Sequence, residues 1–150
     1  MYKHILIATD GSELADKAVR HGLALAKAVN AKVTLLTVSE PMWSAVPGEM
    51  AIAFPHEEYE RATAAKAEII LASVADAAKT KGVVYQAKHS KEQFPADGIV
   101  AAANEGSCDL IIMASHGRHG LAKLVLGSQA AKVVTSSTIP VLVYREPGSN

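Results

Sequence analysis

The segment Lys3–Thr9, with the sequence KHILIAT, is a short and almost continuous apolar run that ends at the turn-forming pair Asp10-Gly11. An apolar run without alternation is typical of a strand that is buried on both faces, as the strands of a parallel sheet are. Parallel strands must be joined by long crossover connections, which are usually helices. The run therefore predicts that strands and helices alternate along this chain.

The rest of the sequence shows this alternation. Helical spacing of apolar residues predicts helices over residues 12–30, 57–81 and 96–105, and from Gly127-Ser128 to about Ser136. Further apolar or β-branched runs predict strands over residues 32–39, 83–88, 108–114 and 139–145. The run over 83–88 is the most polar and is expected at a sheet edge. Five strands and four helices predict an α/β fold, a three-layer open sandwich with a mainly parallel sheet. We expect the strand order 3-2-1-4-5.

Bulk properties restrict the class of protein. A length of 150 residues fits one domain over 1–150, with 146–150 as a polar tail. Fifteen basic residues balance fifteen acidic ones, which excludes a general nucleic-acid or membrane-surface binder. The lone Cys108 excludes an internal disulfide and a cysteine zinc site. With neither a signal peptide nor a membrane span expected from the apolar runs, we expect a cytoplasmic protein.

The segment from Glu40 to His56 has no clean period. It contains Pro41, Pro47 and Pro55 among scattered large apolar residues, which predicts a long irregular loop. Such a loop is either a connection that folds over the core, or a lid or partner surface.

The stretch from Asp109 to Ser128 reads as a buried strand, a glycine-bearing loop and the start of a helix at Gly127-Ser128. No acidic residue occurs between Asp109 and Glu146, whereas four basic residues do: Arg118, Lys123, Lys132 and Arg145. Free N–H groups at a helix N-terminus suit an anion, so this stretch predicts a phosphate site. An ordinary turn at Gly117 and Gly120, followed by a capped helix, explains the same residues equally well. Neither the Walker loop nor the dinucleotide fingerprint is present.

Four side chains in or near this stretch could carry chemistry. Asp10, at the end of the first strand, could bind a ribose hydroxyl or a phosphate-bound magnesium ion, or could satisfy N–H groups at the helix entry. His116 and His119 lack a third ligand in reach by sequence, so no metal site is expected there. Ser115, His116 and Asp10 could form a triad on paper, but the nucleophile elbow is absent, which argues against a hydrolase of that type.

Four segments of the chain carry a resemblance to a known family. They are ILIATDGS at 5–12, DLIIMASHGR at 109–118, LGS at 126–128 and PVLV at 140–143. Together they resemble the universal stress protein family over the whole chain. The nucleotide-binding branch of that family carries Gly, two residues, Gly, nine residues, Gly, and then Ser or Thr.

That frame falls here on Ala114, Gly117, Gly127 and Ser128, so the first motif glycine is an alanine. If the glycine only keeps the strand end slim, the extra methyl group is tolerated. If it needs positive φ, alanine costs about 1 kcal/mol or more and weakens the site. The regular strand pattern before Ala114 favours the first interpretation.

The resemblance implies a site for ATP or AMP, with magnesium held only through the nucleotide at Asp10. Ala8, Thr9 and Asp10 would surround the adenosine, and the backbone of Val38 would bond the adenine. Met113, Ala114, His116 and Gly117 would line the ribose and phosphate path. Gly127, Ser128 and Gln129 would hold the phosphates. The resemblance also implies a homodimer paired through the last strand, at Val141, Leu142, Val143 and Tyr144.

Three functions fit these features. The first is a nucleotide-binding regulatory protein of the stress response with little or no turnover and no catalytic residue. The second is a slow ATP hydrolase, although no evident base or second metal carboxylate accompanies Asp10. The third is a nucleotide-free dimerisation module, in which Ala114 marks a lost site.

Overall fold

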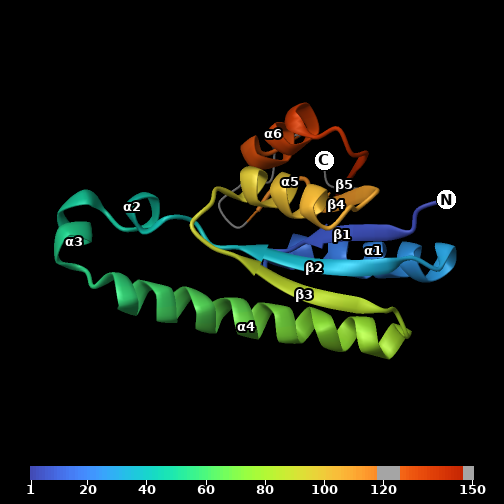
Figure 1. Ribbon diagram of the computed structural model, residues 1–150, viewed down its shortest axis with the longest axis horizontal. Coiled ribbons are helices and arrows are strands. Elements are labelled where there is room, and N and C mark those ends of the chain that lie inside the picture. The colour runs from blue at the N-terminus through green and yellow to red at the C-terminus, as the bar shows by residue number, and fades with distance from the viewer. Residues whose placement is uncertain (118–125, 147–150) are drawn as a thin grey trace.

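A computed structural model describes residues 1–117 and 126–146 and shows a five-stranded sheet (Figure 1). The strands are β1 (His4–Ala8), β2 (Lys32–Val38), β3 (Tyr85–Ser90), β4 (Leu110–Ala114) and β5 (Val141–Tyr144). Their order is β3-β2-β1-β4-β5 and every neighbouring pair is parallel, which confirms the predicted order and class. The polar strand β3 lies at the edge, as its composition predicts.

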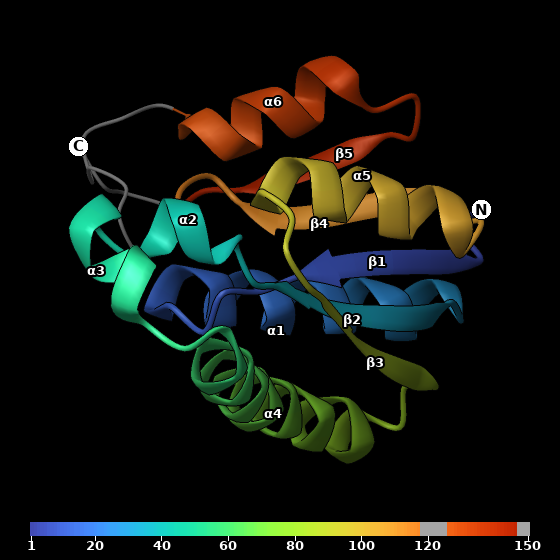
Figure 2. The same cartoon turned by 60° about the vertical axis from the view of Figure 1, so that its left-hand side comes forward.

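Helices cover both faces of the sheet (Figure 2). The longer ones are α1 (Glu13–Val29), α4 (His56–Lys81), α5 (Pro95–Glu105) and α6 (Ser128–Ser136). Alternate residues of β1 separate the two layers of core: Ile5 and Ile7 pack with α1 and α4, whereas Leu6 packs with α5 and α6. A strand that buries both of its faces needs an almost continuous apolar sequence, which is why the run at Lys3–Thr9 has so little alternation.

The prediction of four helices and an irregular loop over 40–56 was wrong. The part of the chain that the structure describes has six helices, because this segment forms α2 (Met42–Ala45) and α3 (Gly48–Ala53). Pro41 and Pro47 stand at the two N-caps, where a proline can precede a first helical turn. Neither helix buries a residue, so no apolar period marks them in the sequence.

Local signals place the ends of α1 and α4 correctly. The Ser12 hydroxyl accepts the Ala15 N–H at 3.2 Å, as an N-cap does. Asn30 and Gly82 close the two helices in the left-handed conformation, with φ of 58° and 69°. The Val83 N–H still bonds the Ala78 carbonyl, which delays β3 by two residues relative to its predicted start.

One close approach fixes the end of β2. A Cβ at Gly98 of α5 would lie 2.9 Å from both methyl carbons of Val38, so only glycine lets α5 pack directly on this residue. Within residues 1–117 and 126–146, no helix is both long and apolar enough to cross a membrane.

Candidate functional site

A cavity of about 590 Å³ lies at the carboxyl ends of β1, β2 and β4. This is the edge of a parallel sheet at which ligands usually bind. All of the predicted site residues line it: Ala8, Thr9, Asp10, Val38, Met113, Ala114, His116, Gly117, Gly127, Ser128 and Gln129. Segments that are far apart in the sequence are therefore brought to one place.

The turn after β1 is held by its own side chains. The hydroxyl of the buried Thr9 accepts the Gly11 N–H at 3.1 Å, and Oδ1 of Asp10 accepts the Ser12 N–H at 3.0 Å. Gly11 has a φ of 78°, which favours glycine. Asp10 thus does serve the helix entry, and it also lines the cavity.

The loop after β4 meets this turn closely. A Cβ at Gly117 would lie 2.7 Å from Oδ2 of Asp10, a separation that real Cβ atoms do not reach. Gly117 therefore allows the two loops to approach each other at the cavity. Arg118, His119, Gly120 and Lys123 lie outside the described residues.

The start of α6 forms another wall. Gly127 is buried at the N-cap and donates its N–H to the Ser115 carbonyl at 2.7 Å, whereas Ser128 is exposed. A Cβ at Gly127 would lie 3.0 Å from that carbonyl oxygen, so this position is also crowded, though less than that of Gly117. The side-chain oxygen of Gln129 accepts the Ala96 N–H at 2.9 Å and so helps to cap α5.

Ala114 occupies an ordinary strand position. It is the last residue of β4 and is not among the described residues with positive φ. Its side chain belongs to a small cluster with Leu14 and Ala18 of α1, and Tyr144 packs against that cluster. The interpretation in which this position needs glycine for a positive φ is therefore wrong. The methyl group of Ala114 is accommodated beneath α1.

The peptide groups of Val38 face the gap beyond β1. The Ser39 N–H donates to the Ser90 carbonyl on β3. The backbone N–H and C=O groups of successive residues point to opposite sides of a strand, so those of Val38 point toward β1. The last paired residue of β1, Ala8, is opposite Leu36. Val38 therefore extends past the end of its neighbour and lines the cavity there.

Sequence reasoning missed the wall that α4 supplies. Its cavity-lining residues are Tyr59, Thr63, Lys66, Ala67 and Ile70. The Tyr59 hydroxyl donates to the Glu40 carbonyl at 2.5 Å, and burial raises the pKa of this phenol, with the charges of Glu40 and Glu92 adding to the effect. Tyr59 and Ile70 lie on the apolar face of the predicted helix, but spacing alone does not separate core residues from cavity walls.

Ser39 and Glu40, directly after β2, also line the cavity, as their place at the carboxyl end of that strand leads one to expect. The Ser39 hydroxyl is hydrogen bonded to Nε2 of His89 at 2.6 Å. Burial lowers the pKa of His89, and Lys91 lowers it further, so this imidazole is neutral at pH 7. Ser115, by contrast, is only 3% exposed, although its Oγ lies 3.3 Å from Nδ1 of His116. A buried hydroxyl is poorly placed to attack a substrate, which agrees with the absence of a nucleophile elbow.

A model of the universal stress protein family matches residues 1–145. The chain belongs to this family. Universal stress protein MJ0531 of Methanocaldococcus jannaschii is 31% identical over 148 residues, which cover 98% of this chain and 84% of that protein. The solved structure of MJ0577, from the same organism, has a TM-score of 0.83 at 29% identity and covers 99% of both chains.

Another solved member of the family is a universal stress protein in complex with cAMP. It has a TM-score of 0.69 at 26% identity and covers 96% of this chain and 97% of its own. The family that the four sequence segments resemble is thus confirmed, and at least one related fold is known with an adenine nucleotide bound.

Proposed function

We propose that this protein is an adenine-nucleotide-binding regulatory protein of the stress response, with little or no catalytic turnover. The observation that carries the proposal is the cavity at the carboxyl ends of β1, β2 and β4, which all of the predicted site residues line. Its volume of about 590 Å³ lies within the range of about 300–1,000 Å³ that is usual for small-molecule sites. The cAMP complex of a relative supports the same class of ligand.

The geometry supports a defined orientation of the nucleotide. The peptide groups of Val38 would bond the edge of adenine, and the Asp10 carboxylate would bond the ribose or a nucleotide-bound magnesium ion. The N-terminus of the nine-residue α6 would receive the phosphates, because its partial positive charge and first-turn N–H groups favour an anion. Gly117 and Gly127 both line the cavity and add no side chain to it.

The same cavity gives little support to fast catalysis. Asp10, Glu40 and Lys66 are the charged side chains among its described lining residues. A second carboxylate next to Asp10 would be needed to hold two metal ions, and a histidine base would need a nucleophile in reach. We therefore propose binding as the function, in a cytoplasmic homodimer paired through β5, whose outer edge has no neighbour in the described sheet.

Identification of the co-purified nucleotide tests the proposal. The protein is purified without added nucleotide and denatured, and the released small molecules are separated and weighed. We expect an adenine nucleotide in the extract, and saturable binding of ATP or AMP to the emptied protein by calorimetry. An empty extract, together with no thermal shift in millimolar ATP and magnesium, would refute binding and favour a nucleotide-free dimerisation module.

A turnover measurement separates a binder from an enzyme. We expect hydrolysis of ATP far below the enzyme median of about 10 per second. A rate near that median, retained after further purification, would instead identify an ATP hydrolase.

A further inference from the structure

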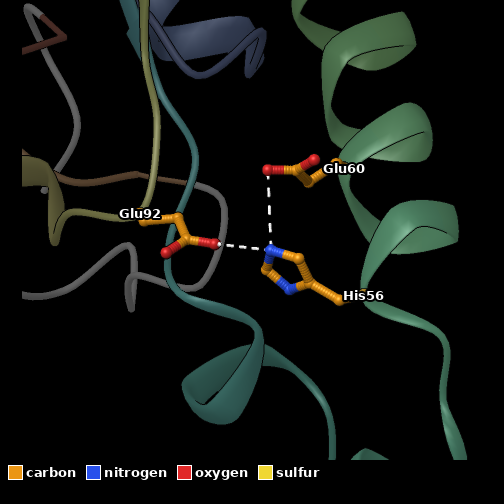
Figure 3. A group of neighbouring side chains, drawn as sticks. All are labelled: His56, Glu60 and Glu92. Carbon is orange, nitrogen blue, oxygen red and sulfur yellow. Dashed lines mark ion pairs between the residues drawn. The ribbon is translucent and has the colours of Figure 1, made fainter.

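Three side chains from two separate segments converge near the N-terminus of α4 (Figure 3). His56 and Glu60 lie one turn apart on α4, and Glu92 lies in the connection between β3 and α5. Nε2 of His56 is 3.5 Å from Oε1 of Glu60 and 3.3 Å from Oε1 of Glu92. All three ligand atoms lie within 4.8 Å of one another.

These distances match the edges of a tetrahedral metal site. Zinc binds imidazole nitrogen and carboxylate oxygen at about 2.0–2.2 Å, so two ligand atoms of a tetrahedral site are separated by about 3.4 Å. The separations of Nε2 of His56 from the two carboxylate oxygens, 3.5 and 3.3 Å, lie on either side of this value. A cation could therefore enter with only small rotations of the three side chains, each of which is about half exposed.

The orientation of the two glutamates also favours a shared ligand. Arg61 follows Glu60 directly and Lys91 precedes Glu92. Neither of these basic side chains forms an ion pair within the described part of the chain. Both carboxylates turn instead toward one imidazole, which is a metal ligand when neutral. One imidazole with two carboxylates suits zinc and its first-row neighbours, whereas magnesium and calcium prefer oxygen ligands alone.

We propose that His56, Glu60 and Glu92 bind a first-row divalent cation, with Zn²⁺ as the natural candidate and water at the fourth position. The ion would join the first turn of α4 to the connection before α5. Tyr59, which lines the cavity, stands between two of the ligands in the sequence, so the ion would also fix this wall. The proposal does not rest on nucleotide binding.

Titration of the full-length protein with Zn²⁺ and Co²⁺ tests this site. Calorimetry and the visible absorption of Co²⁺ should show one specific equivalent with tetrahedral character. Each of His56→Gln, Glu60→Gln and Glu92→Gln should weaken Zn²⁺ binding by at least about tenfold, since even supporting residues of metal sites contribute this much. Glu58→Gln is the matched control, because Glu58 lies in the same first turn of α4 but outside the cluster.

Two results would overturn the proposal. One is an equal Zn²⁺ affinity in the wild type and all three ligand variants, which would assign any binding to other histidines. The other is a His56 ring whose NMR signals titrate with pH but do not respond to Zn²⁺. That outcome would make the cluster an ion-pair triad around a protonated histidine.

Discussion

The two ends of the sheet use polar side chains in opposite ways. At the amino ends of the strands they bond one another: Nε2 of His4 lies 2.8 Å from the Thr34 hydroxyl, which also accepts the Gln86 amide at 2.9 Å. Nδ1 of His4 lies 3.0 Å from the Gly106 carbonyl. Asp109 accepts the N–H groups of Lys3 and His4 at 2.8 and 3.1 Å. This end is a closed network.

At the carboxyl end of the sheet, neighbouring strands end at different positions along their length, and a cavity lies there. There the Thr9 hydroxyl and the Asp10 carboxylate accept N–H groups of their own turn, and glycines stand at 117 and 127, where a Cβ would crowd neighbouring residues. This difference fits the proposed function, in which the amino end contributes stability and the carboxyl end binds the nucleotide. Mutations at the two ends should therefore separate these properties.

The largest effect is expected from Ser128→Asp at the start of α6. Its carboxylate would stand where we place the phosphates, and nucleotide affinity should fall by about a hundredfold or more, which corresponds to about 2.7 kcal/mol. The melting temperature should not fall, because an acidic residue in the first turn stabilises a helix by about 0.3–1 kcal/mol. Calorimetry with ATP measures the affinity.

Ser128→Asn is the control for this prediction, since it has the same shape without the charge. Equal affinities of the two variants would show that the phosphates lie elsewhere. Gly127→Glu is a less clean test, because any Cβ there crowds the Ser115 carbonyl.

Gly117→Ala should have the next largest effect. The new methyl group would lie 2.7 Å from Oδ2 of Asp10 and must displace that carboxylate. We expect nucleotide affinity to fall about tenfold, or about 1.4 kcal/mol. Gly48→Ala is the control, because a Cβ there meets no atom within 4 Å. An unchanged affinity in Gly117→Ala would mean that the position of Asp10 is irrelevant to the ligand.

Breaking the amino-end network should change stability and leave binding intact. Burial lowers the pKa of His4, and Lys32 lowers it further. The unfolded chain therefore takes up a proton near pH 6.5 that the folded chain resists, so stability is complete above that pH and is lost as the pH falls below it. His4→Gln should flatten this slope in melting experiments between pH 5 and 8.

The partly buried His89 also has a lowered pKa and resists protonation, so part of the slope should remain in His4→Gln. Because His4 lies at the other end of the sheet, its replacement should not change nucleotide affinity. A slope identical to that of the wild type would show that His4 does not carry the pH dependence.

The smallest effect on binding is expected from Ala114→Gly, which restores the family motif. Affinity should change by no more than about twofold, or about 0.4 kcal/mol, because the methyl group packs beneath α1. Stability should fall by about 1 kcal/mol, which lowers the melting temperature by about 3 °C. A tenfold gain in affinity would instead show that this methyl group obstructs the ligand.

Most of the cavity wall at the carboxyl end of the sheet could be predicted from the sequence, because the residues that form it follow local sequence rules. The Asp10-Gly11 turn, the Ser12 cap and the glycines of the motif each follow from the chemistry of one or two residues. The strand order follows from the alternation of strands and helices and from the family resemblance, and β3 is recognisable at the edge by its polar composition.

The opposite wall of the cavity could not be predicted in this way. Trp43 and Ile52, on α2 and α3, are 70% and 91% exposed, so these helices have no buried face to leave a period in the sequence. Whether Tyr59 faces the core or a cavity depends on where α4 crosses the strand ends. The position of α4 over the sheet depends on tertiary packing, and the spacing of apolar residues within one helix does not reveal it.

The glycine at position 98 makes the end of β2 a point of mechanical contact between the cavity and the outer surface. Val38 borders the cavity through its peptide groups, and its methyl groups rest on the backbone of α5 with no side chain between them. A side chain in that gap could rotate and absorb a small displacement, whereas backbone against methyl cannot. A shift of Val38 toward α5 would therefore press directly on the backbone of this helix.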